Sequence, residues 1–203
     1  MTNFKKILIL FFSAVSLESN AQSALESAFV KSYQLETVGK YSEAANSLIE
    51  VYETKSYEMN LRLGYLKYME KAYTESQKFY SRAISTMPFS IEAKLGIVYP
   101  LSALNDWNKV TATYKEILAI DPQNSTVNYR MGLISYNGKD YNTAYSYLEK
   151  VVNLYPFSYD GLILFAWTNL NLAKYKEAKL LFERVLLLSP SDASAKEGLS
   201  LIK

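Results

Sequence analysis

Apolar and small residues recur along this chain at helical spacing, and the same order of residue types returns at a fixed interval. One stretch contains Met131-Gly132, Tyr141, Ala144, Leu148 and Val151, and the next contains Phe165-Ala166, Tyr175, Ala178, Phe182 and Val185. Steps of three and four residues place side chains on one face of an α-helix. The pattern therefore predicts two amphipathic helices in each period and no strand.

Prolines and capping residues mark the ends of the periods. Four prolines stand at one constant interval: Pro88, Pro122, Pro156 and Pro190. Two residues after each proline stands a residue suited to begin a helix, in the order Ser90, Asn124, Ser158 and Asp192. Ser56 continues this series without its proline. Because proline ends one helix and the capping residue begins the next, the fixed period predicts a helical solenoid.

The order of residue types resembles the tetratricopeptide repeat. That family has a large and then a small residue on its first helix, and an aromatic residue that opens its second helix. A small, a large and a small residue and a proline follow. The resemblance covers nearly all of residues 22–203 and implies an all-α, right-handed solenoid of about five helix-turn-helix repeats plus a C-terminal capping helix. The expected repeats are residues 23–56, 57–90, 91–124, 125–158 and 159–192, with the cap at 193–203.

Small residues are expected where the two helices of a repeat touch most closely. The pairs are Gly64 with Ser76, Gly132 with Ala144, and Ala166 with Ala178, whereas the third repeat has Val98 and Val110. The aromatic residue that opens each second helix is expected to fill the wedge between repeats: Tyr41, Tyr73, Trp107, Tyr141 and Tyr175. Turns are expected at Gly39-Lys40, Asn105-Asp106 and Asn137-Gly138.

Residues 1–21 have the layout of a secretory signal peptide. Lys5 and Lys6 precede the apolar run from Ile7 to Leu17, and the small residues Ser19 and Ala21 precede a cleavage point. This run is too short to span a bilayer. We expect cleavage after Ala21, no membrane span in the mature chain, and a periplasmic or secreted location. An uncleaved interfacial anchor is the alternative.

The composition excludes several classes of function. The 203 residues contain no Cys and no His, which removes Cys/His metal sites, thiol nucleophiles and the commonest general acid–base residue. The formal net charge of +2 provides no basic surface for nucleic acid. No glycine-rich phosphate loop and no calcium-loop spacing is present. We therefore expect no enzyme activity, no metal, no cofactor and no nucleic-acid partner.

The resemblance implies that the first helix of each repeat lines a concave face, where ligands of this family usually lie. The corresponding positions are mostly apolar or aromatic, with Arg62 and Arg130 on the rims. They are Phe29, Tyr33, Leu61, Tyr65, Tyr68, Leu95, Tyr99, Tyr129, Leu133, Tyr136, Ile163, Trp167 and Leu170. Rigid rings favour recognition of a protein or peptide segment. The alternative is that these rings pack between repeats as core.

Members of the family that hold a C-terminal carboxylate use Lys and Asn on this face. Here the matching positions are Tyr33, Tyr65, Tyr99, Leu133 and Trp167, which argues against such a carboxylate clamp. The sequence thus predicts a non-enzymatic protein–protein interaction scaffold of the bacterial cell envelope, with a Tyr-rich groove. The alternative is a structural subunit of an envelope assembly or secretion complex that docks through its convex face or C-terminal helix.

Overall fold

The computed structural model describes residues 23–202, and these residues form helices joined by short turns with no strand. The first helix spans residues 23–37. It is followed by α2 (Tyr41–Ile49), α3 (Tyr57–Met69), α4 (Tyr73–Thr86), α5 (Ile91–Ala103), α6 (Trp107–Ile120), α7 (Ser125–Asn137), α8 (Tyr141–Leu154), α9 (Tyr159–Asn171), α10 (Tyr175–Leu188) and α11 (Ala193–Leu201). The predicted all-α fold of helix-turn-helix pairs is confirmed. The predicted signal peptide lies outside the described residues.

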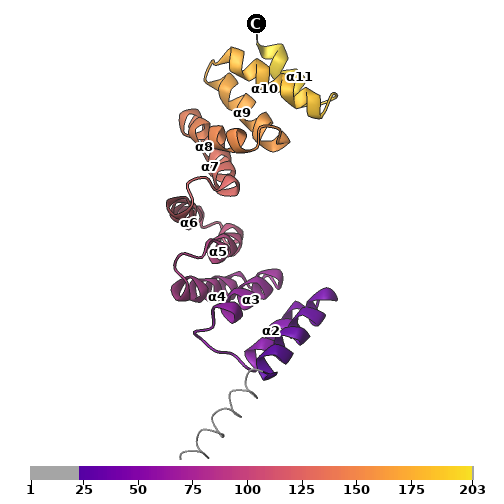
Figure 1. Cartoon of the computed structure of the whole chain (residues 1–203), viewed down its shortest axis with the longest axis vertical. Helices are drawn as coiled ribbons and strands as arrows, with labels where there is room; N and C mark the ends of the chain where they lie inside the picture. Colours follow the sequence, from indigo (N-terminus) through magenta and orange to yellow (C-terminus); the bar gives the residue numbers. More distant parts are fainter. Residues whose placement is uncertain (1–22, 203) are drawn as a thin grey trace, which may run out of the picture. The chain divides into compact units, whose positions relative to one another are not determined.

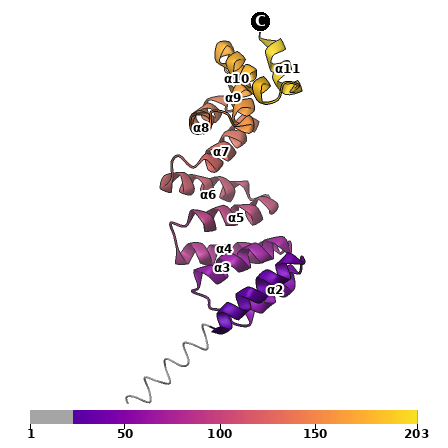
Figure 2. The ribbon, with the colours of Figure 1, turned by 45° about the vertical axis from the view of Figure 1, so that its right-hand side comes forward.

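The chain divides into two compact units, one ending at Val110 and the other beginning at Thr111, so the division falls within α6. In unit 1, α3 packs against α2, α4 and α5, and α4 packs against α5. In unit 2, α8 packs between α7 and α9, and α9 packs against α10 and α11. Figures 1 and 2 show this succession of neighbouring helices within each unit.

The turn inside each helix pair is closed by a residue in the left-handed backbone conformation. These residues are Gly39, Lys71, Asn105, Lys139 and Ala173, with φ between 57° and 75°. The last four are spaced by one repeat period along the sequence, whereas the spacing from Gly39 to Lys71 is slightly shorter. The turn predicted at Asn137-Gly138 is present, but Lys139 rather than Gly138 has the positive φ. Most of these turns thus place a residue with a Cβ in the left-handed conformation, which glycine adopts without strain.

Side-chain capping begins most of the first helices, as the series of polar residues predicted. Ser56 accepts a hydrogen bond from the Met59 N–H at 3.2 Å, and Ser90 accepts one from the Ala93 N–H at 3.1 Å. Asn124 and Asp192 cap α7 and α11 in the same way. Ser158 occupies the capping position of α9 but accepts no such bond. These bonds satisfy N–H groups that a helix terminus otherwise leaves without partners.

Small residues permit close contact between helices, and the tightest contacts surround an aromatic ring. The Ser76 hydroxyl donates to the Gly64 carbonyl at 2.6 Å, which joins α4 to α3. The Tyr80 ring lies between Gly64 and Gly96, and a Cβ added at either glycine would stand less than 3.0 Å from ring atoms. Gly198 in α11 accommodates Phe182 in the same manner. A bulky ring in α4 or α10 therefore requires glycine on the helix that follows.

The rings that open the second helices do not all fill the space between repeats. Trp107 and Tyr175 are 53% and 52% exposed, so the expected core role is wrong for both. The buried large residue is instead found seven positions later, two turns along the same helix face. These residues are Leu48, Tyr80, Tyr114, Leu148 and Phe182. A ring at the helix end projects past its neighbours, whereas a mid-helix residue is covered by them.

Candidate functional site

A groove of about 830 Å³ runs across the first helices of unit 1. Its walls come from the helix of residues 23–37, from α3 and from α5, with one residue from α4. Six residues predicted from the sequence lie on its walls: Phe29, Tyr33, Leu61, Tyr65, Leu95 and Tyr99. The groove is also lined by residues that the sequence pattern did not indicate: Tyr57, Glu58, Tyr80, Ile91, Glu92 and Gly96.

The repeat explains why three helices supply equivalent residues. Each helix contributes two positions four residues apart, such as Leu61 and Tyr65 on α3, and these share one face. Tyr33 and Tyr99 come from the two outer helices, and more than half of each side chain is exposed. Tyr68 does not line the groove, but its ring lies 5.5 Å from that of Tyr99. The groove therefore presents aromatic surface to solvent along both outer walls.

The floor of the groove depends on Gly96 and Tyr80, which both line it. Because Gly96 has no side chain, the buried Tyr80 ring reaches the groove from α4, beneath the first helices. Burial, together with nearby tyrosines and Glu92, raises the pKa of the Tyr80 phenol well above its ordinary value. The phenol therefore stays neutral, and the floor carries no charge.

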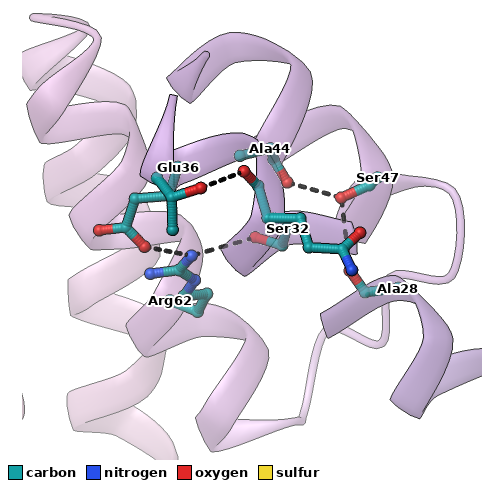
Figure 3. A network of polar contacts seen from close by, with 8 residues as sticks. Ala28, Ser32, Glu36, Ala44, Ser47 and Arg62 are labelled. Atoms are coloured by element: carbon teal, nitrogen blue, oxygen red, sulfur yellow. Dashed lines mark hydrogen bonds and ion pairs between the residues drawn. The ribbon is translucent and has the colours of Figure 1, made fainter. Parts of the chain in front are cut away.

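Arg62 does not lie on the rim, as the sequence suggested, but is buried in the groove wall with a side chain 9% exposed. Its guanidinium lies 2.5 Å from the Glu36 carboxylate and donates to the Ser32 hydroxyl at 3.3 Å, as Figure 3 shows. It also lies over the ring of Tyr33, 4.0 Å from the centroid, and within 5.6 Å of that of Tyr65. The positive charge of Arg62 is thus compensated inside the protein.

The ion pair changes the titration of its neighbours. Burial alone would raise the pKa of Glu36, but hydrogen bonds from Tyr65 and Arg62 and the guanidinium charge lower it below its ordinary value. The hydrogen bond to Glu36, followed by burial, raises the pKa of Tyr65 to about 12. Both groups therefore hold one protonation state across the neutral range, and they join the helix of residues 23–37 to α3.

One end of the groove is acidic. Glu58 and Glu92 lie in the first turns of α3 and α5. The Tyr57 hydroxyl spans these helices, since it lies 2.7 Å from the Ser90 hydroxyl and donates to Glu92 at 3.2 Å. The two glutamates stand one repeat period apart, and this was visible in the sequence. The pairing of Arg62 with Glu36 was not visible in the sequence. Because of this pairing, Glu58 and Glu92 are the uncompensated charges of the groove.

The predicted groove residues of unit 2 are arranged differently. Tyr129, Leu133, Tyr136, Ile163, Trp167 and Leu170 are partly buried and pack against the core of this unit. Trp167 contacts the Phe182 ring at 5.3 Å, and its indole N–H donates to the Ser194 hydroxyl of α11 at 2.8 Å. Tyr129 also lines a smaller hollow of about 360 Å³ beside Arg130 and Asp160. In unit 2 these positions therefore contribute chiefly to packing.

The described residues contain no group of three or more acidic side chains placed to hold a metal ion. Across residues 23–202, no helix has both the length and the apolar character needed to cross a bilayer. What the groove of unit 1 offers is aromatic and aliphatic surface, one compensated ion pair and two carboxylates. Such an arrangement can bind a ligand by burial, ring contacts and charge.

Family models described as "Tetratricopeptide repeat" match residues 127–158 and 159–192. The fold is similar to that of a tetratricopeptide repeat protein from Parabacteroides merdae, with a TM-score of 0.74 and 20% identity over 88% of this chain and 72% of that one. It is also similar to MamA from Desulfovibrio magneticus RS-1, with a TM-score of 0.69 and 17% identity over 84% of this chain and 97% of that one. No curated protein matches the sequence.

Proposed function

Because this chain belongs to the tetratricopeptide repeat family, whose members are generally non-catalytic protein-binding scaffolds, we propose that it holds a protein or peptide segment in the groove of unit 1. The proposal includes a place in the bacterial cell envelope. The observation that carries it is the pair Tyr33 and Tyr99, more than half exposed on opposite walls of an 830 Å³ groove. Rings held on helices lose little conformational entropy on binding, which favours them as anchors.

The mutational test uses rings matched in exposure. Tyr33 and Tyr99 are 54% and 58% exposed in the groove, and Tyr175 is 52% exposed on α10. Replacing Tyr33 or Tyr99 with Ala is expected to weaken capture of the native partner at least tenfold. Replacing Tyr175 with Ala is expected to leave capture unchanged. If all three variants capture the partner as the unmodified chain does, the groove is not its binding site.

A photo-crosslinking residue tests the same site without removing a contact. Placed at Tyr99, it is expected to form one dominant adduct in the native host, and mass spectrometry of the adduct would identify the bound segment. The same residue at Tyr175 serves as the control. Equal yields of the same adduct at both positions would contradict a site in the groove.

The proposed location in the cell envelope depends on the predicted signal peptide. The layout of residues 1–21 supports export, with cleavage after Ala21 and a mature chain that begins at Gln22. Intact-mass measurement on protein isolated from its host tests this part. A mass that includes residues 1–21 would contradict cleavage. It would not affect the proposed binding in the groove, which the mutational and crosslinking experiments test.

A second candidate function is that of a subunit that docks through its C-terminal helices. Leu180 and Leu187 on α10 are 61% and 73% exposed and lie two helical turns apart, and Leu201 on α11 is 56% exposed. Exposed apolar residues on one helix face favour contact with a partner. Replacing Leu180 and Leu187 with Gln is expected to dissolve a stoichiometric complex if this candidate is right, and to leave peptide capture by the groove unchanged.

A further inference from the structure

The charges of the groove in unit 1 do not balance. Its lining contains Glu58, Arg62 and Glu92. Arg62, in the groove wall, is paired with Glu36 at 2.5 Å, so that pair adds no net charge. Within residues 23–202, Glu58 and Glu92 accept hydrogen bonds from Ser56 and Tyr57 at 3.1 Å and 3.2 Å, but neither pairs with a cation. The groove thus presents two negative charges amid apolar and aromatic surface.

Both carboxylates line the groove together with Tyr57. Tyr57 donates to Glu92, and Glu58 follows Tyr57 directly in α3. Burial, together with the charges of Glu92 and Glu58, raises the pKa of the Tyr57 phenol. This effect outweighs the hydrogen bond from Ser90, which lowers that pKa. Both carboxylates therefore act electrostatically on the Tyr57 hydroxyl. A groove lined by aromatic rings and two carboxylates is suited to a cation, because the aromatic faces and both charges attract it.

We propose that the partner segment bound in this groove carries a Lys or Arg side chain that lies between Glu58 and Glu92, beside apolar residues that cover Leu61, Leu95 and the Tyr80–Gly96 floor. This inference rests on the proposed function and adds the chemical identity of the ligand. The cation would take the place of water around the two carboxylates as the apolar residues close the groove.

The same charges argue against other segments. An acidic side chain or a free C-terminal carboxylate would be brought close to Glu58 and Glu92 in a partly dehydrated groove, which costs free energy. Each glutamate also stabilises its own helix, because it lies in a first turn near the positive end of the helix dipole. That role uses the carboxylate without neutralising it, so the charge remains available to a ligand.

The experiment uses an array of acetylated, amidated hexapeptides probed with the labelled protein as isolated from its host. Five positions vary among Leu, Ile, Phe and Tyr, and one position is Lys, Arg, Glu or norleucine. Blocked termini leave that side chain as the only charge. We expect Lys and Arg peptides to bind at least fivefold more strongly than norleucine peptides, Glu peptides to bind most weakly, and the preference for Lys and Arg to fall as salt is added.

Variants locate the effect. Glu58→Gln, Glu92→Gln and the double variant should abolish the preference for Lys and Arg while norleucine peptides still bind. Glu177→Gln is the matched control, since Glu177 is an exposed first-turn residue of α10 outside this groove. The comparison of Lys with norleucine peptides on the unmodified chain remains decisive even if a variant is unstable.

The outcomes separate this inference from the proposed function. Equal binding of Lys and norleucine peptides, lost on Tyr99→Ala, would overturn the cation and keep the groove. Binding that Tyr99→Ala does not change would overturn both. Sedimentation of the protein as a dimer that Tyr99→Ala dissociates would show a second copy in the groove, and this also overturns both. A preference for Lys and Arg that survives the double Gln variant would overturn the assignment to Glu58 and Glu92.

Discussion

Replacing Gly96 with Ala tests how the groove floor is built. The added Cβ would lie 2.7 Å from Tyr80 Cζ and nearer still to Cε1, whereas ordinary contacts begin at 3.4 Å. The ring would have to move until that separation is restored. It has no room on its other side, because Gly64 already lies against it. Overpacking of this kind costs about 1–3 kcal/mol, against a gain of about 1 kcal/mol in helix propensity.

We therefore expect Gly96→Ala to lower the free energy of unfolding by up to about 2 kcal/mol. The loss should disappear when Tyr80 is first replaced with Leu, because the ring that meets the new methyl group is then absent. The chain contains a precedent two repeats later, where Leu148 and Leu164 occupy the equivalent positions and both are buried. A double-mutant cycle should show a coupling of about 2 kcal/mol between the two substitutions.

Urea unfolding followed by far-ultraviolet circular dichroism measures the loss, and hydrogen exchange of α4 and α5 shows where it acts. Hydrogen exchange is needed because solenoid repeats do not always unfold in one step. Gly138→Ala is the control. An added Cβ there meets no atom closer than 3.4 Å, and the residue has φ −76°, so no loss is expected. An equal loss with and without the Tyr80→Leu substitution would refute the packing argument.

Three further predictions follow from other contacts. Because the folded pKa of Glu36 is lowered and that of Tyr65 is raised to about 12, their contributions to stability should be lost as pH falls below about 4.5 and as pH rises from about 10 to 12. Melting temperature against pH should show both limbs, and Glu36→Gln should reduce the acid one without removing it, because the pKa values of Glu70, Asp106, Asp140 and Asp192 are lowered as well. Ala173→Gly should raise the free energy of unfolding by about 0.5–1 kcal/mol, since φ there is 57°; an unchanged or lower value in denaturant titration would contradict this. Trp167→Ala should lower stability by about 2 kcal/mol or more, whereas Tyr99→Ala should change it by less than about 1 kcal/mol; similar melting curves for the two would contradict the different roles of the first-helix rings in the two units.

The sequence determined the repeat and the ends of its helices. The period is read from the order of residue types along the chain, and capping and turn signals act between residues a few positions apart. All three can therefore be recognised without knowledge of the tertiary contacts. The capping bonds of Ser56, Ser90, Asn124 and Asp192 illustrate this, since each joins a side chain to a backbone group three residues on. The positions of the six groove residues from three helices also follow from the period, whereas their role in binding stays a prediction.

Tertiary structure alone decided the state of individual side chains. Tyr80 fills the space between Gly64 of the second repeat and Gly96 of the third, because a mid-helix ring is covered by the helices on both sides. Arg62 is charge-compensated only because Glu36, which belongs to the preceding repeat, comes within reach when the helices stack. Equivalent first-helix positions line one groove in unit 1, where Phe29 and Tyr65 also pack against the core, whereas in unit 2 all six pack against the core. Burial and charge depend on partners that are distant in the chain, and a local pattern does not contain them.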